Sequence, residues 1–397
     1  MDKFLFVAII LFLLGAFAVN AIAQYLNIRF LNPRLPEEFQ DAYDAQKYKK
    51  SQEYAREQAR LDILESSVSL FLLLVFIFIN GFNLVDNLVR SWGLSTLGTG
   101  LVFFGLLGLA SSLISLPFEL YHTFVLEERF NFNKMNWVTF IKDKLKGLLL
   151  LLAIGVPVLA AILWFFQKFS TWGWLYAWLF ITVASLILSY LAPRIILPLF
   201  NKFTPLEEGE LRQKIINYAQ KVGFNLSGIY VMDGSKRSTK SNAFFTGFGK
   251  TKRIALFDTL IEKHSNDELL AILAHEVGHY KLKHIIKNMG LSIIKMGILL
   301  WLVSFFIQYE PLFAAFNMDH VSVHAGLIFF ALLYTPVSLI LGLVFNHLSR
   351  KYEYQADEFA AKTTNKPQDL IAALKRLSVD NLSNLTPHPF YVVLNYS

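Results

Sequence analysis

Ala274-His275-Glu276-Val277-Gly278-His279-Tyr280 is the most informative stretch of this chain. It contains H-E-x-x-H, and histidines four positions apart lie one turn apart on one face of a helix. One zinc ion can bind both imidazoles there, while the glutamate beside the first histidine is placed to act on water. The pattern has only three fixed positions and also arises by chance on solvated helices. The surrounding sequence must therefore decide between a metal site and a coincidence.

The sequence before the motif predicts strands followed by a helix. Ser265 and Glu268 have the spacing of a capping box, and apolar residues then recur at helical spacing, which predicts a helix over residues 266–284. Upstream runs that suit strands lie at residues 229–232, 241–247 and 253–257. Strands followed by a metal-binding helix are the expected core of a zincin, so the context favours the metal site.

Composition places the chain in a membrane. Of its 397 residues, 54% are hydrophobic and only 17% are charged, which is too apolar for an ordinary soluble protein. The absence of cysteine excludes disulfides, thiolate metal sites and a cysteine nucleophile. The net charge of +7 accompanies no base-reading motif, so we attribute it to basic loops and expect no nucleic-acid partner.

Apolar runs of about 20 residues predict seven membrane spans. They cover residues 4–23, 67–84, 99–118, 148–166, 174–191, 289–307 and 326–345. The first run ends in Ala21-Ile22-Ala23, which resembles a signal-peptidase site, but we interpret it as a span. The predicted division is five spans with their loops over 1–195, a metalloprotease core over 196–288, two spans over 289–345 and a helical protease segment over 346–397.

Basic residues predict the orientation of the spans. Lysine and arginine concentrate in the segments after spans one, three and five. The opposite segments hold only Arg90, only Lys168 and, between the last two spans, no basic residue. The positive-inside rule therefore puts the N-terminus outside, and the large loop after span five and the C-terminus in the cytoplasm. The membrane would be the inner membrane of a bacterium or the endoplasmic reticulum of a eukaryote.

A third metal ligand is expected after the last span. Glu353 and Asp357 are four apart and so share one face of a predicted helix. Two membrane crossings separate them from His275, which returns them to the same side of the membrane. The alternative is an ordinary charged helix below the membrane, in which Arg350 pairs with Glu353.

Two motifs together resemble the integral-membrane zinc CAAX prenyl protease family. They are H-E-V-G-H-Y-K-L-K-H at 275–284 and S-R-K-Y-E-Y-Q-A-D-E-F-A at 349–360. Further matching runs begin at Pro117, Pro198, Ser241 and Leu256. The resemblance extends from about residue 47 to the end. It implies a multi-pass α-helical membrane protein of seven spans around a chamber, capped by a cytoplasmic α+β zincin domain.

The resemblance also implies roles for particular residues. One Zn²⁺ per chain would be held by His275, His279 and Glu353, with Glu276 as the catalytic base. Asp357 matches an aspartate regarded as a proton donor, although a carboxylate that orients a ligand imidazole is an equally good interpretation.

Asn242 and Ala243 match the edge strand along which the substrate peptide lies in the family, and strand addition suits an extended peptide. A hydrogen bond at the strand end is the alternative for Asn242. His284 fits no ligand spacing, so we expect a satisfied polar residue there.

The expected function is a zinc endopeptidase that cuts near the C-terminus of a prenylated CAAX-type protein. The expected partners are that peptide or protein and membrane lipid, and we expect a monomer. In a bacterium, membrane-protein quality control would be the nearest alternative. A zinc transporter would need ligands at mid-membrane, and an inactive scaffold would not need Glu276.

The final segment, residues 387–397, follows the family pattern to its last residue. Relatives then continue with a histidine and an arginine that are thought to stabilise the oxyanion and hold the substrate carboxylate. We expect a truncated sequence, in which zinc binding survives while turnover is low.

Overall fold

Long apolar helices make up most of the molecule. The computed structural model describes residues 3–169, 171–246 and 253–396, and six of its helical stretches are long and apolar enough to cross a membrane. They are α1 (Lys3–Phe30), α2 (Ala45–Phe78), α4 to α5 (Thr96–Arg129), α6 to α7 (Trp137–Lys168), α8 to α9 (Gly173–Phe200) and α13 (His284–Phe306). A bent pair, α15 (Val323–Leu333) and α16 (Thr335–Thr364), raises the number of candidate spans to seven.

Two of these spans differ from the sequence prediction. The second ends at Phe78, because Asn80 takes a left-handed conformation and the chain turns into a separate helix, α3 (Gly81–Arg90), which contains Leu84. The seventh bends by 58° between α15 and α16. Pro336 lies in the first turn of α16, where the missing N–H of proline needs no helical partner, so the break falls just before it.

Three long helices contain a π-helical turn. These turns separate α4 (Thr96–Tyr121) from α5 (Glu127–Arg129), α6 (Trp137–Leu150) from α7 (Val156–Lys168), and α8 (Gly173–Leu191) from α9 (Leu197–Phe200). In the second case Val156 N–H bonds to Leu151 C=O, directly before Pro157. Proline cannot donate to the preceding turn, and a widened turn accommodates that gap.

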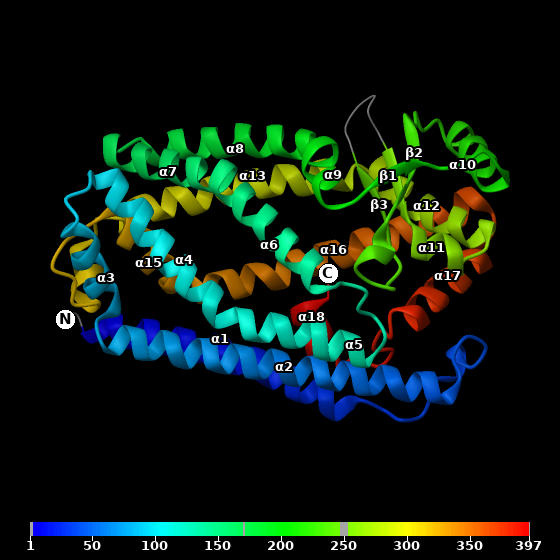
Figure 1. The fold of residues 1–397 in the computed structure, drawn as a ribbon, viewed down its shortest axis with the longest axis horizontal. Coiled ribbons are helices and arrows are strands. Elements are labelled where there is room, and N and C mark those ends of the chain that lie inside the picture. Colours follow the sequence, from blue (N-terminus) through cyan, green and yellow to red (C-terminus); the bar gives the residue numbers. More distant parts are fainter. Residues whose placement is uncertain (1–2, 170, 247–252, 397) are drawn as a thin grey trace.

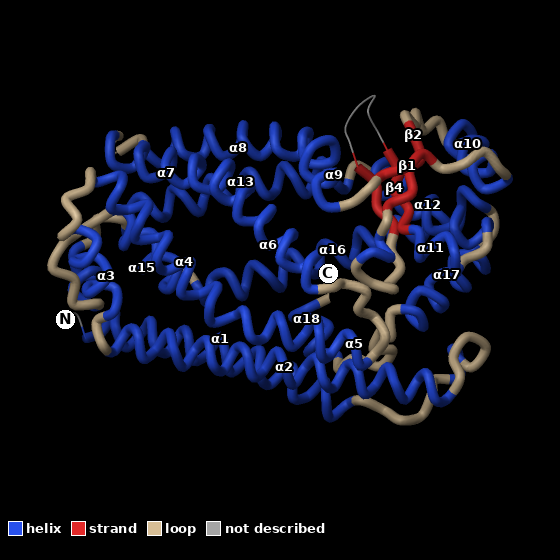
Figure 2. The backbone as a smooth tube through the Cα atoms, viewed as in Figure 1, coloured by secondary structure: helices blue, strands red, loops and turns tan. Residues whose placement is uncertain are grey.

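The membrane helices pack around two apolar clusters. Figures 1 and 2 show how these helices are arranged. One joins α1, the end of α2, α3, α4, α15 and the short helix α14 (Glu310–Ala315), around Phe103 and Phe329. The other joins α7, α8, α13 and α15 around Leu163 and Val303. Both include residues of α15, which thereby connects the two groups of helices at the end of the molecule away from the sheet.

A four-stranded sheet lies at the other end of the molecule (Figure 2). Its order is β1-β2-β4-β3, with β2 and β4 parallel and both outer pairs antiparallel. The strands are β1 (Phe203–Pro205), β2 (Gly228–Met232), β3 (Ala243–Thr246) and β4 (Arg253–Phe257). The three predicted strands are present, although residue 247, the predicted end of the second one, lies outside the described residues. β1 was not predicted, and its proline is tolerated because β1 is an edge strand.

Helices cover this sheet and form a separate apolar core with it. They are α10 (Glu210–Lys221), α11 (Asp258–Lys263), α12 (Asn266–Lys281) and α17 (Pro367–Asp380), with the short α18 (Pro389–Asn395) following. Leu256 of β4, Leu269 and Leu273 of α12 and Ala373 of α17 are almost fully buried in one cluster. The protease end is therefore built from two chain segments that the last two spans separate.

Candidate functional site

The helix α12 is fixed at its first turn by the predicted capping box. Ser265 Oγ accepts from the Glu268 backbone N–H at 3.3 Å, and the Glu268 carboxylate accepts from the Ser265 N–H at 2.7 Å. Apolar residues on one side of α12 then enter the core below the sheet. This arrangement holds the opposite side of α12, with its two histidines, toward α16.

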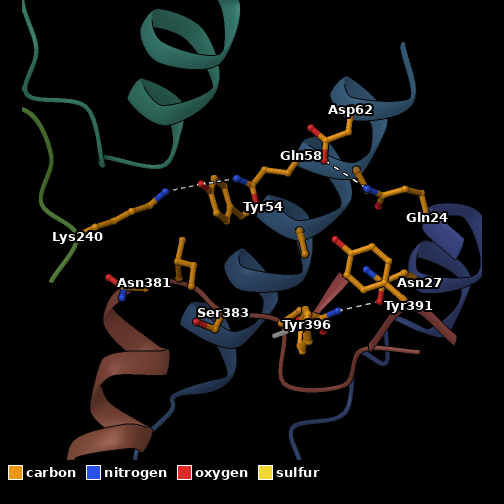
Figure 3. A pocket seen from close by; sticks show the side chains of 14 residues that line it. Gln24, Asn27, Tyr54, Gln58, Asp62, Lys240, Asn381, Ser383, Tyr391 and Tyr396 are labelled. Atoms are coloured by element: carbon orange, nitrogen blue, oxygen red, sulfur yellow. Dashed lines mark hydrogen bonds between the residues drawn. The ribbon is translucent and has the colours of Figure 1, made fainter. Parts of the chain in front are cut away.

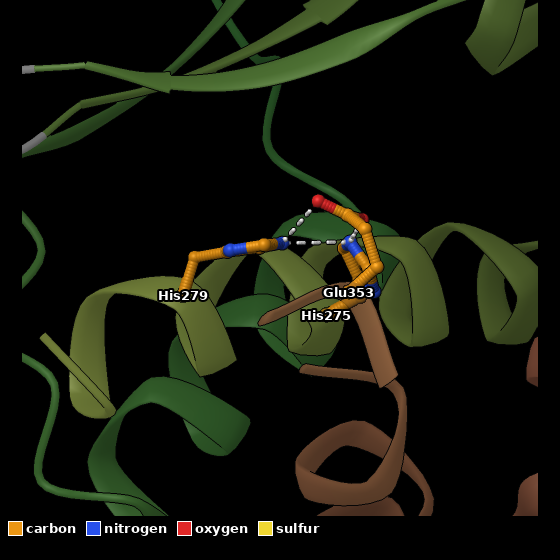
Figure 4. Close-up of side chains that lie close together, drawn as sticks. All are labelled: His275, His279 and Glu353. Carbon is orange, nitrogen blue, oxygen red and sulfur yellow. Dashed lines mark hydrogen bonds and ion pairs between the residues drawn. The ribbon is translucent and has the colours of Figure 1, made fainter. Parts of the chain in front are cut away.

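His275, His279 and Glu353 come together in one cluster (Figure 4). The two Nε2 atoms are 3.1 Å apart. Glu353 places one carboxylate oxygen 3.3 Å from Nε2 of His275 and the other 3.5 Å from Nε2 of His279. Two ligands bound about 2.0–2.1 Å from a tetrahedral zinc lie roughly 3.3 Å apart, so the spacing fits one ion. Two imidazoles and one carboxylate are also a donor set of catalytic zinc sites.

Asp357 lies behind His275 rather than among the three ligand atoms. Nδ1 of His275 is 2.7 Å from Oδ1 of Asp357, so that nitrogen donates and Nε2 keeps its lone pair toward the cluster. Burial lowers the pKa of His275, but the carboxylates of Asp357 and Glu353, which accept hydrogen bonds from the ring, outweigh burial and raise the pKa to about 9. The carboxylates therefore favour a positive charge at this point, which a metal cation also supplies.

Glu276 points from α12 toward the edge strand β3. Burial raises the pKa of its carboxyl group above the usual value, while the neighbouring imidazoles and the backbone N–H of Phe245 act in the opposite direction. A desolvated carboxylate with a raised pKa is a stronger base than one in water. Its position next to the cluster and the strand suits proton transfer at a peptide bond.

The crossing of α12 and α16 depends on a glycine inside the motif. A Cβ at Gly278 would lie 3.2 Å from both Cα and O of Ala356 on α16. The neighbouring atoms are backbone, so they cannot move aside as a flexible side chain would. The close approach of the two helices brings Glu353 and Asp357 within reach of the histidines.

Asn242 and Ala243 lie where β3 begins. Asn242 is exposed, its Oδ1 accepts from the Ala243 N–H at 2.8 Å, and its carbonyl accepts from Phe257 N–H at 3.1 Å. β3 pairs only with β4 in the four-stranded order, so its other side is an edge. The strand-end hydrogen bond expected as the alternative role of Asn242 is present.

A hydrogen-bond network that no sequence motif predicts anchors the segment just before β3. Lys240 Nζ donates to Tyr54 Oη at 2.7 Å and to Glu127 Oε1 at 3.0 Å, and Tyr54 also donates to Glu127. Asn381 accepts a hydrogen bond from the backbone N–H of Ser241 through Oδ1 and donates one to its C=O through Nδ2. These partners lie far apart in the sequence and follow no motif, so only the folded structure reveals them.

A polar pocket of about 370 Å³ opens beside this network (Figure 3). Its walls come from α1, α2, the segment after α17 and Lys240. Asp62 accepts from Gln24 there at 3.4 Å. The ligand cluster does not line this pocket, so the two are separate features of the protease end.

Comparison with known proteins gives consistent matches over the whole length. Residues 24–202 match the family described as CAAX prenyl protease N-terminal, five membrane helices, and residues 205–393 match peptidase family M48. The chain is 36% identical to CAAX prenyl protease 1 of Saccharomyces cerevisiae, over 97% of this chain and 91% of that protein. A probable CAAX prenyl protease 1 of Schizosaccharomyces pombe is 38% identical, over 97% and 85%.

The fold is similar to a crystal structure of S. mikatae Ste24p. The TM-score is 0.94 at 34% sequence identity, and the superposition covers 99% of this chain and 96% of the other. Six to seven candidate spans with an attached protease end are therefore an architecture already seen in a solved protein.

Proposed function

The chain belongs to the CAAX prenyl protease 1 group of peptidase family M48 and is therefore a membrane metallopeptidase, and we propose that its metal is zinc and its substrate a prenylated CAAX-type protein. The short distances in the cluster support this proposal most strongly: the two Nε2 atoms are 3.1 Å apart, and each lies 3.3–3.5 Å from an oxygen of Glu353. Zinc, when bound, supplies a Lewis acid for the scissile carbonyl and for water.

Each side chain of the site has a separate role in the proposed reaction. His275, His279 and Glu353 hold the ion, and Glu276 takes a proton from the attacking water and delivers it to the leaving amine. Asp357 orients the imidazole of His275 through the 2.7 Å hydrogen bond, which we favour over a proton-donor role.

The substrate lies in extended form along the outer edge of β3, in the proposed binding mode. Asn242 and Ala243 start that edge, and main-chain hydrogen bonds to an added strand would place the scissile bond beside Glu276. Two long helices, α13 and α16, lead from the ligand cluster into the group of membrane helices, and we propose that the prenyl chain lies among these helices. The chain would act as a monomer with lipid around it.

We also propose that the protease end faces the cytoplasm. The basic residues concentrate on that side, in agreement with the positive-inside rule. In a eukaryote this would be the endoplasmic reticulum, and in a bacterium the inner membrane.

Three variants test the proposed chemistry with purified protein and a quenched prenylated peptide. Glu276→Gln should keep zinc and lose about 10²–10⁴-fold in kcat. His279→Ala and Glu353→Ala should lose zinc, and chelator should abolish turnover by the unaltered protein. Glu262→Gln makes the same chemical change at an exposed position on α11 and should alter neither property.

The outcomes separate the alternatives. Full zinc occupancy in Glu353→Ala would overturn the ligand assignment, and unchanged turnover in Glu276→Gln would remove the proposed base. Equal cleavage of prenylated and unprenylated peptides would favour a general quality-control protease. Zinc binding without any peptidase activity would favour a transporter or scaffold.

A further inference from the structure

His284 lies directly behind His279, on the side away from the ligand cluster. Its Nδ1 is 3.2 Å from Nδ1 of His279, and its Nε2 is 3.0 Å from Oε1 of Gln355. The imidazole is 1% exposed and stacks on Tyr352, with ring centres 4.2 Å apart and planes at 13°. A polar ring buried this deeply must satisfy both nitrogens, and the two contacts do so.

The turn between α12 and α13 creates this position. Lys283 has φ of +60°, so the chain reverses there and α13 begins at His284, beneath the last turn of α12. The residue five positions after His279 is thereby brought back against it. Helical spacing alone would have placed it on another face of α12, which explains why the sequence did not indicate it.

The hydrogen-bond roles along this chain follow from chemistry. A carbonyl oxygen can only accept, so Gln355 Oε1 requires a proton on Nε2 of His284. A neutral imidazole then has only a lone pair at Nδ1, which must accept from Nδ1–H of His279. His279 is left with its lone pair on Nε2, the atom that faces His275 and Glu353.

We propose that Gln355 and His284 form a relay that fixes the tautomer and orientation of His279 for metal binding. It is the counterpart of the Asp357 contact to His275, reached through two residues. Gln355 and His284 are positioning residues, and the inference rests on the proposed ligand role of His279. A hydrogen-bond donor in place of the Gln355 acceptor would favour the opposite tautomer of His284 and so of His279. Nε2 of His279 would then carry hydrogen and could not bind a cation.

Zinc affinity of the full chain in detergent, measured by competition with a chromophoric chelator, tests the relay. Gln355→Glu keeps an acceptor and should bind zinc as tightly as the unaltered protein or more tightly. Gln355→Met has a similar shape without an acceptor and should bind about 10–100-fold more weakly. His284→Phe keeps an aromatic ring for stacking on Tyr352 but has no nitrogen, and it should match Gln355→Met.

Three controls make the result decisive. Tyr354→Phe alters an exposed side chain beside Gln355 on α16 and should leave affinity unchanged. The double variant of His284→Phe with Gln355→Met should be no weaker than either single change, because both interrupt one path. The absorption spectrum of bound Co²⁺ should change in the variants that lose the acceptor and stay unchanged in Gln355→Glu.

Equal affinities for Gln355→Glu and Gln355→Met would overturn the relay, as would full affinity in His284→Phe. If the role of these residues is purely structural, the variants should have a lower unfolding temperature without metal. Their zinc affinities should then not depend on whether residue 355 can accept a hydrogen bond. If His279→Ala itself keeps full zinc affinity, the ligand assignment has failed instead, and this is distinguishable from failure of the relay.

Discussion

At the scale of single residues, neighbouring positions on one helix have different roles at the site. On α16, Glu353 faces both imidazole Nε2 atoms, Gln355 contacts His284 and Asp357 contacts His275. The first side chain would touch the ion, while the other two set which nitrogen of each histidine carries the proton. Substitutions at these positions should therefore have different effects: loss of Glu353 removes a ligand, whereas changes at Gln355 or Asp357 alter the protonation of a histidine.

Replacing Asp357 distinguishes its two possible roles. Asp357→Ala should weaken zinc binding about 10–100-fold, because His275 loses the acceptor for its Nδ1–H. The exposed neighbour on the same helix, Glu358→Ala, should bind zinc normally. Chelator competition measures both variants. Unchanged zinc affinity combined with lost turnover would instead assign Asp357 as the proton donor.

His264, which lies outside the ligand cluster, should make the free energy of unfolding depend on pH. Burial lowers its pKa below 6.5, its Nδ1 donates to the Leu260 carbonyl, and among the described residues nothing accepts from Nε2. The neutral form fits the fold, so the unfolded chain binds more protons at mildly acidic pH. This contribution is complete above about pH 6.5 and declines as the pH falls below it.

The measurement compares thermal unfolding midpoints at about pH 7 and about pH 5. His264→Gln should show a drop smaller by a few degrees than the unaltered protein, since glutamine stays neutral. His320→Gln, at an exposed site between α14 and α15, is the matched control and should behave like the unaltered protein. Identical pH dependence in all three proteins would contradict the assignment.

At the scale of elements, the crossing of α12 and α16 determines whether a site exists. Gly278 and Ala356 are both small, and a Cβ at Gly278 would lie 3.2 Å from the backbone of Ala356. Ligands from the two helices must meet within a few tenths of an ångström, so a small change in helix separation matters more here than elsewhere in the chain.

Gly278→Ala should separate the two helices. We expect turnover to fall about 10–100-fold and zinc to bind more weakly, because Glu353 would be displaced from the histidines. Gly290→Ala on α13 makes the same change where no heavy atom lies within 4 Å of the new methyl group, and it should be neutral. Normal zinc affinity in Gly278→Ala would show that α16 can shift without loss of the site.

Local signals account for the elements that the sequence predicted well. The capping box and apolar spacing predicted the start of α12, but the helix ends at Lys281 instead of residue 284, because Lys283 takes a left-handed conformation. The run at residues 253–257 is β4 as predicted. The edge strand β1 has only three residues and a proline, so its pairing with β2 left no local signal. The separate helix α3 was missed because one left-handed residue, Asn80, ends α2 inside a continuous apolar run.

The same distinction applies to the candidate site. His275 and His279 followed from spacing on one helix, and Glu353 from counting membrane crossings. His284 was treated as an ordinary polar residue, because its contact with His279 depends on the turn at Lys283. The anchoring of Lys240 by Tyr54 and Glu127 needed three distant segments to fold together, which no pattern in a single sequence reports.

At the scale of the whole molecule, the two ends of the helical body are built differently. One end carries the sheet and the ligand cluster, and the other carries α3, α14 and α15 around buried aromatic rings (Figure 1). The basic segments fall on the side of the sheet. The orientation of the protein can therefore be measured with one probe at each end.

The chain contains no cysteine, so single cysteines can report orientation with little background. Glu207→Cys lies exposed on the protease side and His320→Cys lies exposed at the opposite end. On sealed vesicles with the cytoplasmic face outward, an impermeant thiol reagent should label position 207 and reach position 320 only after detergent is added. The reverse pattern would invert the proposed topology.

The division of the site between α12 and α16 also affects the biogenesis of the protein. A ribosome delivers the two histidines first, and Glu353 follows only after α13 and α15 have been synthesised. Until those helices are inserted in the bilayer, the nascent chain holds an incomplete set of ligands. If the three residues hold the metal as proposed, a chain whose synthesis stops before α16 lacks one ligand and should not cleave the proteins around it.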